Sequence, residues 1–284
     1  MGSIAFIGAG RLGASLAMAL SRQGCAVRAV ASRSATSAQA LAGAVPGCRA
    51  TTIEEAATAD LVFLTVPDDR IAATAASLSW RAGQQVVHCS GATEVAALDA
   101  AARQGALTGG FHPLQIFSDP QRALPLIAGS AVAIEGPPAL EARLTELATL
   151  LGMRPLHLPP GARALYHAGA SFAASFLLSM LQEALAAWRN FGIDEQAALQ
   201  ALLPLARGTL DMAQARGLAG ALAGPVSRGD AGVVGRHVEA MAGLGPAHAA
   251  FYREFALRQL ELARASGRLD EAQLAALRQA IGAG

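Results

Sequence analysis

The sequence GGFHPLQIF, residues 109–117, places His112 between an aromatic residue and a proline in a chain of 284 residues with six histidines. An imidazole titrates near neutral pH and can give or take a proton there. His112 follows the strand-like run ALTGGF, and Pro113 would stiffen the turn after it. The alternative is a histidine that caps the strand end through hydrogen bonds to the backbone. His112 is therefore a candidate acid/base residue, with the structural alternative left open.

The choice of proton carriers is narrowed by the basic residues of the chain. All 22 of them are arginine, and the sequence contains no lysine. Neither Schiff-base chemistry nor a lysine general acid can come from this chain. A proton must then be carried by His, Ser, Tyr, Asp, Glu or water.

A second group of candidate residues lies in the segment LYHAGASFAAS. Tyr166 and His167 are adjacent, and His167, Ser171 and Ser175 are spaced four residues apart, which places them on one face of a helix. We predict that His167 is catalytic and that Ser171 binds substrate. The alternative is a packing helix of small residues whose hydroxyls bond to the preceding turn.

Two further polar side chains could contact a substrate. Gln115 could orient the substrate or a carboxamide, although an ordinary loop amide is as good an interpretation. Arg228, in the segment GPVSRGD, could bind a substrate carboxylate in its own subunit or across a dimer interface, or it could form a structural ion pair. Ser227 or Asp230 in this segment is a plausible helix N-cap. No set of His, Asp, Glu and Cys has metal-ligand spacing, so we predict no metal.

The segment FIGAGRLGASLAMAL contains a GxGxxG pattern that follows a strand-like run and opens a helix. The first glycine permits a tight turn, the second lets the backbone approach a pyrophosphate, and the third allows close packing of helix on strand. The helix N-terminus offers free N–H groups to the anion. The predicted cofactor-binding residues of this loop are Gly8, Ala9, Gly10, Arg11, Leu12 and Gly13.

The end of the next strand indicates which dinucleotide binds. An NAD enzyme usually has a carboxylate there to bond the ribose 2′-hydroxyl. This chain has Ser32, Arg33 and Ser34 instead, with no carboxylate nearby. A guanidinium and hydroxyls suit a 2′-phosphate. We therefore expect NADP, with NAD as the alternative, and a solvated loop arginine as the structural interpretation of Arg33.

Two later strands should also end at the ligand crevice, because ligands of such sheets bind at the carboxyl ends of the strands. The run LVFLTVPD brings Val66, Pro67 and Asp68 there, and the run VVHCSGA brings Ser90 and Gly91. His88 and Cys89, within the second run, are interpreted as packing residues.

The elements that must position these residues change in kind near residue 160. Before it, short apolar runs alternate with helical patterns, as in βαβ units. The segment LPPGARA, residues 158–164, reads as a hinge, and helical patterns follow it. We predict an α/β fold in which a doubly wound parallel sheet of the Rossmann type (residues 1–160) precedes an all-α domain for substrate binding and dimerisation (residues 161–284).

Composition restricts the partners. The net charge is +1, which gives no indication of nucleic acid or an anionic membrane as partner, and 53% of residues are hydrophobic against 15% charged. The three cysteines have no metal or redox spacing, which favours a cytoplasmic location. The apolar segment 167–188 is interrupted by Gln182 and Glu183, so we expect a buried helix and not a membrane span.

The chain resembles one family over nearly its whole length. The motifs that carry this resemblance are the glycine loop, the run TVPD, the pair HCSGA and GGFHPLQ, and the later segments YHAGASFAASFLL and GPVSRGD. The family consists of Rossmann-like NADP oxidoreductases with a helical C-terminal domain of unknown function. The resemblance implies a fold related to pyrroline-5-carboxylate reductase, prephenate dehydrogenase and the 6-phosphogluconate dehydrogenase superfamily. It also implies dimers built through the C-terminal helices, and it implies no substrate.

A looser similarity concerns His112 alone. Prephenate dehydrogenases place a His-Pro pair after a Gly-Ser strand end, and their histidine engages the substrate hydroxyl that loses a proton. Here Ser90-Gly91 precedes His112-Pro113 in a comparable order, but Leu114-Gln115 departs from that pattern and the prephenate-binding arginines are not recognisable. The similarity implies a role for His112 and not a substrate.

The resulting hypothesis is an NADP-dependent oxidoreductase that moves a hydride between the nicotinamide and a small polar substrate held between the two domains. One alternative is an NADP-binding sensor or interaction protein without turnover. Another is a reductase that exchanges the hydride with a deazaflavin partner. The sequence does not identify the substrate, the direction of reaction or the pathway.

Overall fold

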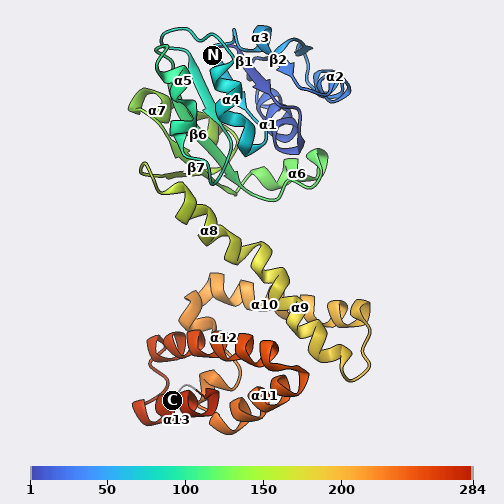
Figure 1. Cartoon of the computed structure of the whole chain (residues 1–284), viewed down its shortest axis with the longest axis vertical. Coiled ribbons are helices and arrows are strands. Elements are labelled where there is room, and N and C mark those ends of the chain that lie inside the picture. The colour runs from blue at the N-terminus through green and yellow to red at the C-terminus, as the bar shows by residue number, and fades with distance from the viewer. Residues whose placement is uncertain (1, 283–284) are drawn as a thin grey trace. The chain divides into compact units, whose positions relative to one another are not determined.

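The computed structural model describes residues 2–282, which divide into two compact units, Met1–Phe172 and Ala173–Gly284 (Figure 1). The first unit contains the whole sheet and the second is helical. The predicted fold class, a Rossmann-type α/β domain followed by an all-α domain, is therefore confirmed. The predicted boundary at residues 160 and 161 stays a prediction.

The first unit is an eight-stranded sheet with the order β3-β2-β1-β4-β5-β6-β7-β8. All neighbouring strands are parallel except β6 and β7. The strands are β1 (Ile4–Ile7), β2 (Val27–Ala31), β3 (Arg49–Ala50), β4 (Leu61–Leu64), β5 (Gln85–His88), β6 (Leu107–Leu114), β7 (Ala131–Glu135) and β8 (Arg154–His157). The helices between them are α1 (Arg11–Arg22), α2 (Ala35–Ala44), α3 (Ile53–Ala56), α4 (Ile71–Ala76), α5 (Asp99–Ala102), α6 (Pro120–Ile127) and α7 (Pro138–Leu150).

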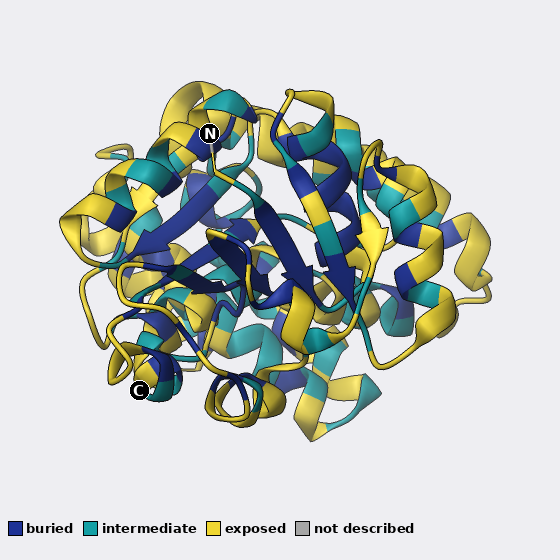
Figure 2. Cartoon of the chain, turned by 90° about the horizontal axis from the view of Figure 1, so that it is seen from above, coloured by how far each residue is buried: buried dark blue, intermediate teal, exposed yellow. Residues whose placement is uncertain are grey.

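The central strands are continuous apolar runs because both faces of the sheet are covered. Figure 2 shows these strands in the colour of buried residues. Successive side chains point to opposite faces, so Phe6 and Phe63 lie in the core on one face, while Ile7 and Leu64 lie in the core on the other. The rings of Phe6 and Phe63 stack with their centroids 5.0 Å apart. The sheet that carries the candidate residues is thus packed on both sides.

Local sequence signals mark where helices begin and end. The side chain of Thr52 accepts a hydrogen bond from the backbone of Glu55, and the Glu55 carboxylate accepts one from the Thr52 backbone, which forms a capping box at the start of α3. Gly24 follows α1 with φ of 80°, a left-handed conformation that favours glycine after a helix.

Strand β6 is longer than the sequence pattern suggested. We expected a strand end at Phe111 and a turn at Pro113, but β6 runs to Leu114. Up to Gly110 it pairs in parallel with β5, and from Gly110 onward it pairs antiparallel with β7. Proline is tolerated there because β6 has only one neighbour beyond Gly110. His112 consequently lies inside a strand, past the end of β5.

The helical stretch after the hinge differs from expectation too. The apolar segment 167–188 divides at Ala174, whose φ of −119° and ψ of −92° are not helical, into α8 (Arg163–Ala173) and α9 (Ser175–Arg189). Many of its large apolar side chains are exposed, with Phe172 65% and Leu178 67% accessible. The expected buried helix is therefore wrong for the chain alone. Among the described residues this stretch, Arg163–Arg189, is the one long and apolar enough to span a membrane, a test that core helices of globular proteins also pass.

The second unit packs its last three helices around a small core of its own. The core residues include Val234, Leu260 and Leu277. His248 lies 2.6 Å from the Glu183 carboxylate, which links α12 (Pro246–Ala265) to α9. The other helices of this unit are α10 (Glu195–Ala221), α11 (Ala231–Leu244) and α13 (Glu271–Ile281).

Candidate functional site

The glycine loop lies between β1 and α1, and each glycine has a separate steric reason. Gly8 has φ of 116°, and a Cβ there would overlap the backbone carbonyl of Thr65. A Cβ on Gly13 would lie 2.5 Å from the Gly8 carbonyl oxygen, so the helix can approach the loop only without a side chain. Gly10 has no atom within 4 Å of such a Cβ, and it caps α1 without a side-chain bond. This geometry fits a ligand phosphate at Gly10, whose approach needs an open backbone and free N–H groups.

The other predicted cofactor residues occupy the carboxyl ends of neighbouring strands. Ser32, Arg33 and Ser34 follow β2, and the Ser34 hydroxyl accepts a hydrogen bond from the Ser37 backbone, so it caps α2. Arg33 is exposed, and no hydrogen bond or ion pair of its guanidinium is formed within the described residues. Asp68 follows β4, and its carboxylate accepts a 2.7 Å hydrogen bond from the Ser90 hydroxyl after β5.

His112 lies at the same edge of the sheet, where it meets the first turns of α8. Its Nδ1 is 3.0 Å from the hydroxyl oxygen of Tyr166, and the two rings are edge to face. The His167 ring lies edge-on to His112, with centroids 5.9 Å apart. The structure thus brings the two predicted catalytic histidines together and adds Tyr166, which contacts His112.

Gly91 makes this cluster sterically possible. A Cβ at Gly91 would lie 2.5 Å from His167 Cδ2 and 2.8 Å from His112 Cε1. Any side chain at Gly91 would therefore displace one imidazole or both. The predicted cofactor residue Gly91 is in contact with the predicted catalytic residues, all within the first unit.

The cluster holds His112 uncharged at neutral pH. Burial, then the charges of His167 and Arg163, lower the pKa of His112 to about 4, and the nearby Asp68 carboxylate opposes this shift. Burial also raises the pKa of Tyr166, against the effect of Arg163. Both groups are therefore neutral at pH 7, and together they can exchange a proton without a net charge in the site.

Within the described residues, none of the predicted substrate residues forms a hydrogen bond with the side chain of His112 or His167. The Gln115 amide donates to the Leu126 carbonyl and its oxygen accepts from the Ile116 backbone, as an ordinary loop amide does. The Ser171 hydroxyl donates to the His167 carbonyl at 3.1 Å, which is the local bonding of a helix hydroxyl. Arg228 lies in the second unit on an exposed turn, and its guanidinium has no hydrogen bond or ion pair to another described residue. Asp230 caps α11 by accepting from the Val233 backbone.

Sequence reasoning missed a charged residue behind the cluster. Arg163, the first residue of α8, is completely buried and forms an ion pair with Glu135 at the end of β7, with Nε and Oε2 2.6 Å apart. Arg163 stands 28 residues after Glu135 and directly after a hinge motif, so nothing local indicates the pair. The available signal was the glycine pair at 109 and 110, which has no turn to make and instead leaves room for neighbours.

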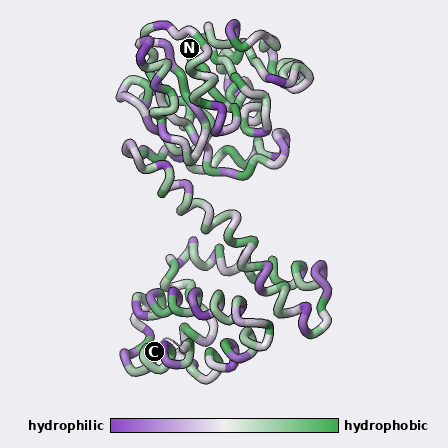
Figure 3. Tube along the Cα trace, in the orientation of Figure 1, coloured by the Kyte–Doolittle hydropathy of each residue, from purple (hydrophilic) through white to green (hydrophobic). Residues whose placement is uncertain are grey.

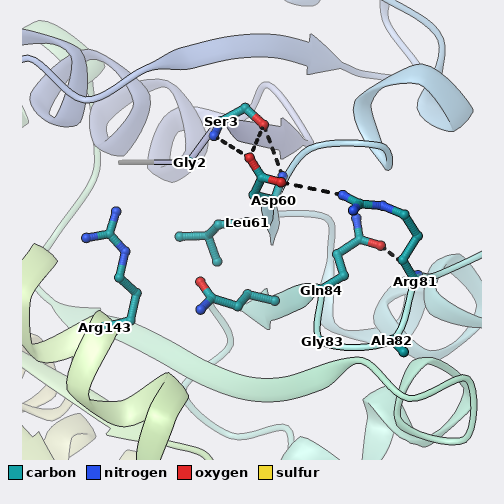
Figure 4. Close-up of a pocket in the computed structure, with 10 residues that line it drawn as sticks. Gly2, Ser3, Asp60, Leu61, Arg81, Ala82, Gly83, Gln84 and Arg143 are labelled. Carbon is teal, nitrogen blue, oxygen red and sulfur yellow. Dashed lines mark hydrogen bonds and ion pairs between the residues drawn. The ribbon is translucent and has the colours of Figure 1, made fainter.

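A cavity of about 270 Å³ lies at the other edge of the sheet (Figure 4). Ser3, Asp60 and Gln85, at the amino ends of β1, β4 and β5, line it together with Arg81 and Arg143. Asp60 there accepts hydrogen bonds from the backbone and hydroxyl of Ser3 and lies 3.6 Å from Arg81. The cavity is remote from the strand ends that carry the histidines. Elsewhere too, residues 2–282 hold no group of three His, Cys, Asp or Glu that could bind a metal.

His88 predicts how the first unit responds to acid. It is fully buried on β5, and burial together with Arg163 lowers its pKa to about 3. In the unfolded chain His88 has an ordinary pKa and takes up a proton near pH 6.5, whereas in the folded protein it does not until about pH 3. The contribution of His88 to the free energy of unfolding is therefore fully present above pH 6.5 and falls as the pH drops toward about 3. We expect His88 to lower the free energy of unfolding by about 1.4 kcal/mol between about pH 7.5 and about pH 5.5. Urea unfolding measures this, followed by Trp80 fluorescence in a Trp188→Phe background.

The controls separate His88 from other titrating groups. His88→Gln should remove about 1.4 kcal/mol of that pH dependence, whereas the exposed His237→Gln should leave it unchanged. Equal pH dependence in the parent and His88→Gln proteins would show that His88 is not buried as a neutral imidazole.

Two family descriptions match the chain. A Rossmann-like domain matches residues 2–113, and a domain of unknown function, DUF2520, matches residues 130–259. The second match begins at β7, so it includes the last two strands of the sheet. No curated protein matches the sequence.

Solved structures share the fold over almost the whole chain. A protein from Thermotoga maritima is 24% identical with a TM-score of 0.79, over 93% of this chain and all of its own. A "putative NADP oxidoreductase" from Bacteroides fragilis is 26% identical with a TM-score of 0.69, over 93% of this chain and 97% of its own. A reductive aminase from Aspergillus terreus, in complex with NADPH and ethyl-5-oxohexanoate, is 16% identical with a TM-score of 0.68, over 96% of this chain and 98% of its own.

These matches agree with the family that the motifs resemble. The glycine loop and the strand ends with TVPD and HCSGA lie inside the first match, as does His112, while Tyr166, His167 and Arg228 lie inside the second. The chain therefore joins a segment that matches a Rossmann-like domain to a segment that matches DUF2520.

Proposed function

We propose that this protein is an NADP(H)-dependent oxidoreductase that transfers a hydride between the nicotinamide and the carbonyl or imine carbon of a small polar substrate. One observation carries the proposal: the neutral His112–Tyr166 pair lies at the carboxyl edge of the same sheet whose first strand ends in an open glycine loop. A reductase of this kind needs both a place for the dinucleotide and a group that handles the accompanying proton.

The cofactor is assigned to Gly8, Gly10 and Gly13 for the pyrophosphate and to Arg33 for the 2′-phosphate. Bound NADPH supplies the hydride. The Aspergillus terreus reductive aminase contains NADPH, and an imine reductase variant from Myxococcus stipitatus contains NAD⁺, so the shared fold accommodates both dinucleotides. NADP is favoured here because an exposed guanidinium, and no carboxylate, follows β2.

Tyr166 and His112 then move the proton. Because His112 is neutral at pH 7, it is not an imidazolium acid. In the tautomer with hydrogen on Nδ1, His112 donates to the Tyr166 oxygen and leaves the Tyr166 O–H for the substrate. As Tyr166 gives its proton to the substrate heteroatom, His112 passes the Nδ1 proton to the phenol oxygen and takes a proton from water at Nε2. His112 thereby stays neutral in its other tautomer, and water supplies the proton that the substrate gains. In the oxidation direction all three transfers reverse.

His167 and Arg228 are proposed as substrate contacts. His167 is exposed beside His112 and can donate or accept at the substrate's polar group. Arg228 has an exposed guanidinium that suits a carboxylate. Gln115 and Ser171, whose hydrogen bonds are satisfied locally, are weaker assignments.

The protein is further proposed to form a homodimer in the cytoplasm, with no nucleic acid or membrane as partner. The support is the number of exposed apolar side chains on α8 and, in the second unit, on α9 and α10; Figure 3 colours these helices by the hydropathy of each residue. The exposed side chains include Leu165, Phe172, Phe176, Leu178, Leu205, Leu210 and Leu218. Large apolar side chains exposed in such number usually mark an interface.

Arg33→Asp tests the cofactor assignment. The change should weaken NADPH binding by about 100-fold and NADH binding by less than about 3-fold, because a charge-assisted bond to the 2′-phosphate is replaced by repulsion. Fluorescence titration of the full chain with each cofactor gives both dissociation constants. Arg49→Asp on β3, also exposed, is the matched control and should leave both unchanged. Equal losses for the two cofactors would overturn the assignment of Arg33.

Turnover decides between an enzyme and a sensor. NADPH oxidation is followed with keto acids, cyclic imines and ketones, and NADP⁺ reduction with cyclohexadienols and hydroxy acids. Turnover with any of these supports the proposal. Tight NADPH binding without oxidation across the panel would favour a sensor, and oxidation with a deazaflavin alone would favour the deazaflavin reductase.

A further inference from the structure

Arg163 is the largest side chain with no exposed surface in residues 2–282. Charged side chains are almost never fully buried unless they are paired. Arg163 begins α8, so Tyr166 and His167 follow it within one turn of the same helix. Its burial fixes the end of α8 that carries two of the three aromatic residues of the site.

The guanidinium contacts three other elements and is bonded to two of them. Its Nε donates to Glu135 Oε2 at the end of β7, at 2.6 Å, and its Nη1 donates to the Ser90 carbonyl after β5, at 2.8 Å. Its Nη2 occupies the space that a Cβ would take at Gly110 on β6. Gly91 follows Ser90 and His112 stands two residues after Gly110, so two of these contacts are close in sequence to residues of the site.

The backbone at the start of α8 is fixed independently of the guanidinium. The Glu94 carboxylate accepts hydrogen bonds from the backbone N–H of Gly161 at 3.1 Å and of Arg163 at 3.2 Å. Two carboxylates, Glu94 and Glu135, therefore hold one helix end against the sheet.

This arrangement is poorly suited to stability alone. A buried ion pair can often be replaced by apolar residues without loss. Arg163 Nη2 and the nearby His88 Nε2 are both buried without a hydrogen-bond partner among the described residues, which is unfavourable. The ion pair instead fixes the orientation of the start of α8, because a guanidinium forms its hydrogen bonds at fixed angles.

The same charge acts on His112. The groups that face His112 are Arg163, Tyr166 and His167 from α8, Asp68 after β4 and His88 on β5. Arg163 lowers the pKa of His112, after burial and His167, and Asp68 raises it. Removing the guanidinium should therefore let His112 take up a proton at higher pH.

We propose that Arg163 is the positioning residue of this site: its buried guanidinium ties α8 to β6, β7 and the Ser90 loop, and so holds Tyr166 and His167 against His112. This positioning role rests on the proposed function, because it matters only if His112 and Tyr166 move the proton. Its test needs no substrate or cofactor, so a protein without turnover can still confirm or overturn it.

The experiment is a histidine NMR titration of the full chain, with His112 assigned from the spectrum of His112→Gln. The test variant, Arg163→Met with Glu135→Leu, removes the pair without leaving a buried charge. We expect His112 to titrate roughly one pH unit higher than in the parent protein. We also expect the proton contacts between the His112 and Tyr166 rings to weaken or vanish.

The matched control removes an ion pair of the same chemistry elsewhere. Arg264 and Glu271 form an exposed pair at 2.9 Å in the second unit, and Arg264→Met with Glu271→Leu should change neither readout. A folded test variant with unchanged His112 titration and unchanged ring contacts overturns the proposal. Should that variant fail to fold, Arg163→Lys decides: it keeps the charge but replaces the planar guanidinium by a single nitrogen without fixed bond directions. Unchanged ring contacts in it overturn the proposal.

Discussion

Replacing Tyr166 by phenylalanine should lower kcat by about 10²- to 10³-fold, because it removes the hydroxyl to which the proposed mechanism assigns the proton transfer to the substrate. The ring and its edge-to-face contact with His112 remain, so the fold should be unchanged. The dissociation constant for NADPH should stay within about 2-fold of that of the parent protein. His112→Ala should lower kcat to a similar extent. The double variant should lose little more than either single one, since residues that act as a unit are not additive. Steady-state kinetics with the best substrate of the panel measures all three.

The chain supplies its own control for this pair. His237 and Tyr252 in the second unit form the same contact, with Nδ1 2.9 Å from the hydroxyl and the rings 5.9 Å apart. Tyr252→Phe should therefore leave kcat unchanged. Unaltered turnover in Tyr166→Phe would remove Tyr166 from the mechanism, and unaltered turnover in His112→Ala would remove His112.

The pH profile separates a neutral His112 from an ordinary one. Because the pKa of His112 is about 4, kcat should show no break near pH 6.5 that depends on His112. A break near pH 6.5 that disappears in His112→Gln would mean that His112 works as an imidazolium, and the tautomer exchange with Tyr166 would be wrong.

The glycine loop was predictable from sequence because its spacing is local and recurs wherever a strand turns into a helix above a phosphate. The steric need for Gly8 and Gly13 also involves Thr65, at the end of the neighbouring strand β4, which the spacing does not show. The capping box of Thr52 and the cap at Asp230 were predictable because a helix cap depends on residues within a few positions of one another.

The surroundings of His112 were only partly predictable, because they depend on pairings distant in sequence. The partner switch of β6 from β5 to β7 extends the strand through Pro113, against the local indication of a turn. Tyr166 meets His112 across 54 positions and Arg163 meets Glu135 across 28. The exposure of α8 and α9 was also missed, since an apolar helix predicts burial without saying what covers it.

Gly110→Ala should destabilise the first unit by about 3 kcal/mol or more, through overpacking and disruption of a buried ion pair. The added methyl group would overlap the Arg163 guanidinium, which Glu135 and the Ser90 carbonyl hold in place. The backbone of Gly110 is an ordinary strand conformation, so alanine meets no conformational penalty there and the effect is purely steric. Urea unfolding followed by Trp80 fluorescence measures it.

A second background shows whether the guanidinium is the cause. In the Arg163→Met, Glu135→Leu protein, the guanidinium beside residue 110 is absent, so Gly110→Ala should lower the free energy of unfolding by less than about 1 kcal/mol. The difference between the two backgrounds is then about 2 kcal/mol or more. Gly43→Ala on α2, where a methyl group meets no atom within 4 Å, should instead be neutral or stabilising by up to about 1 kcal/mol. An equal loss from Gly110→Ala in both backgrounds would place the clash elsewhere. The glycine before Phe111 and His112 would then serve the sheet and not the arginine behind the site.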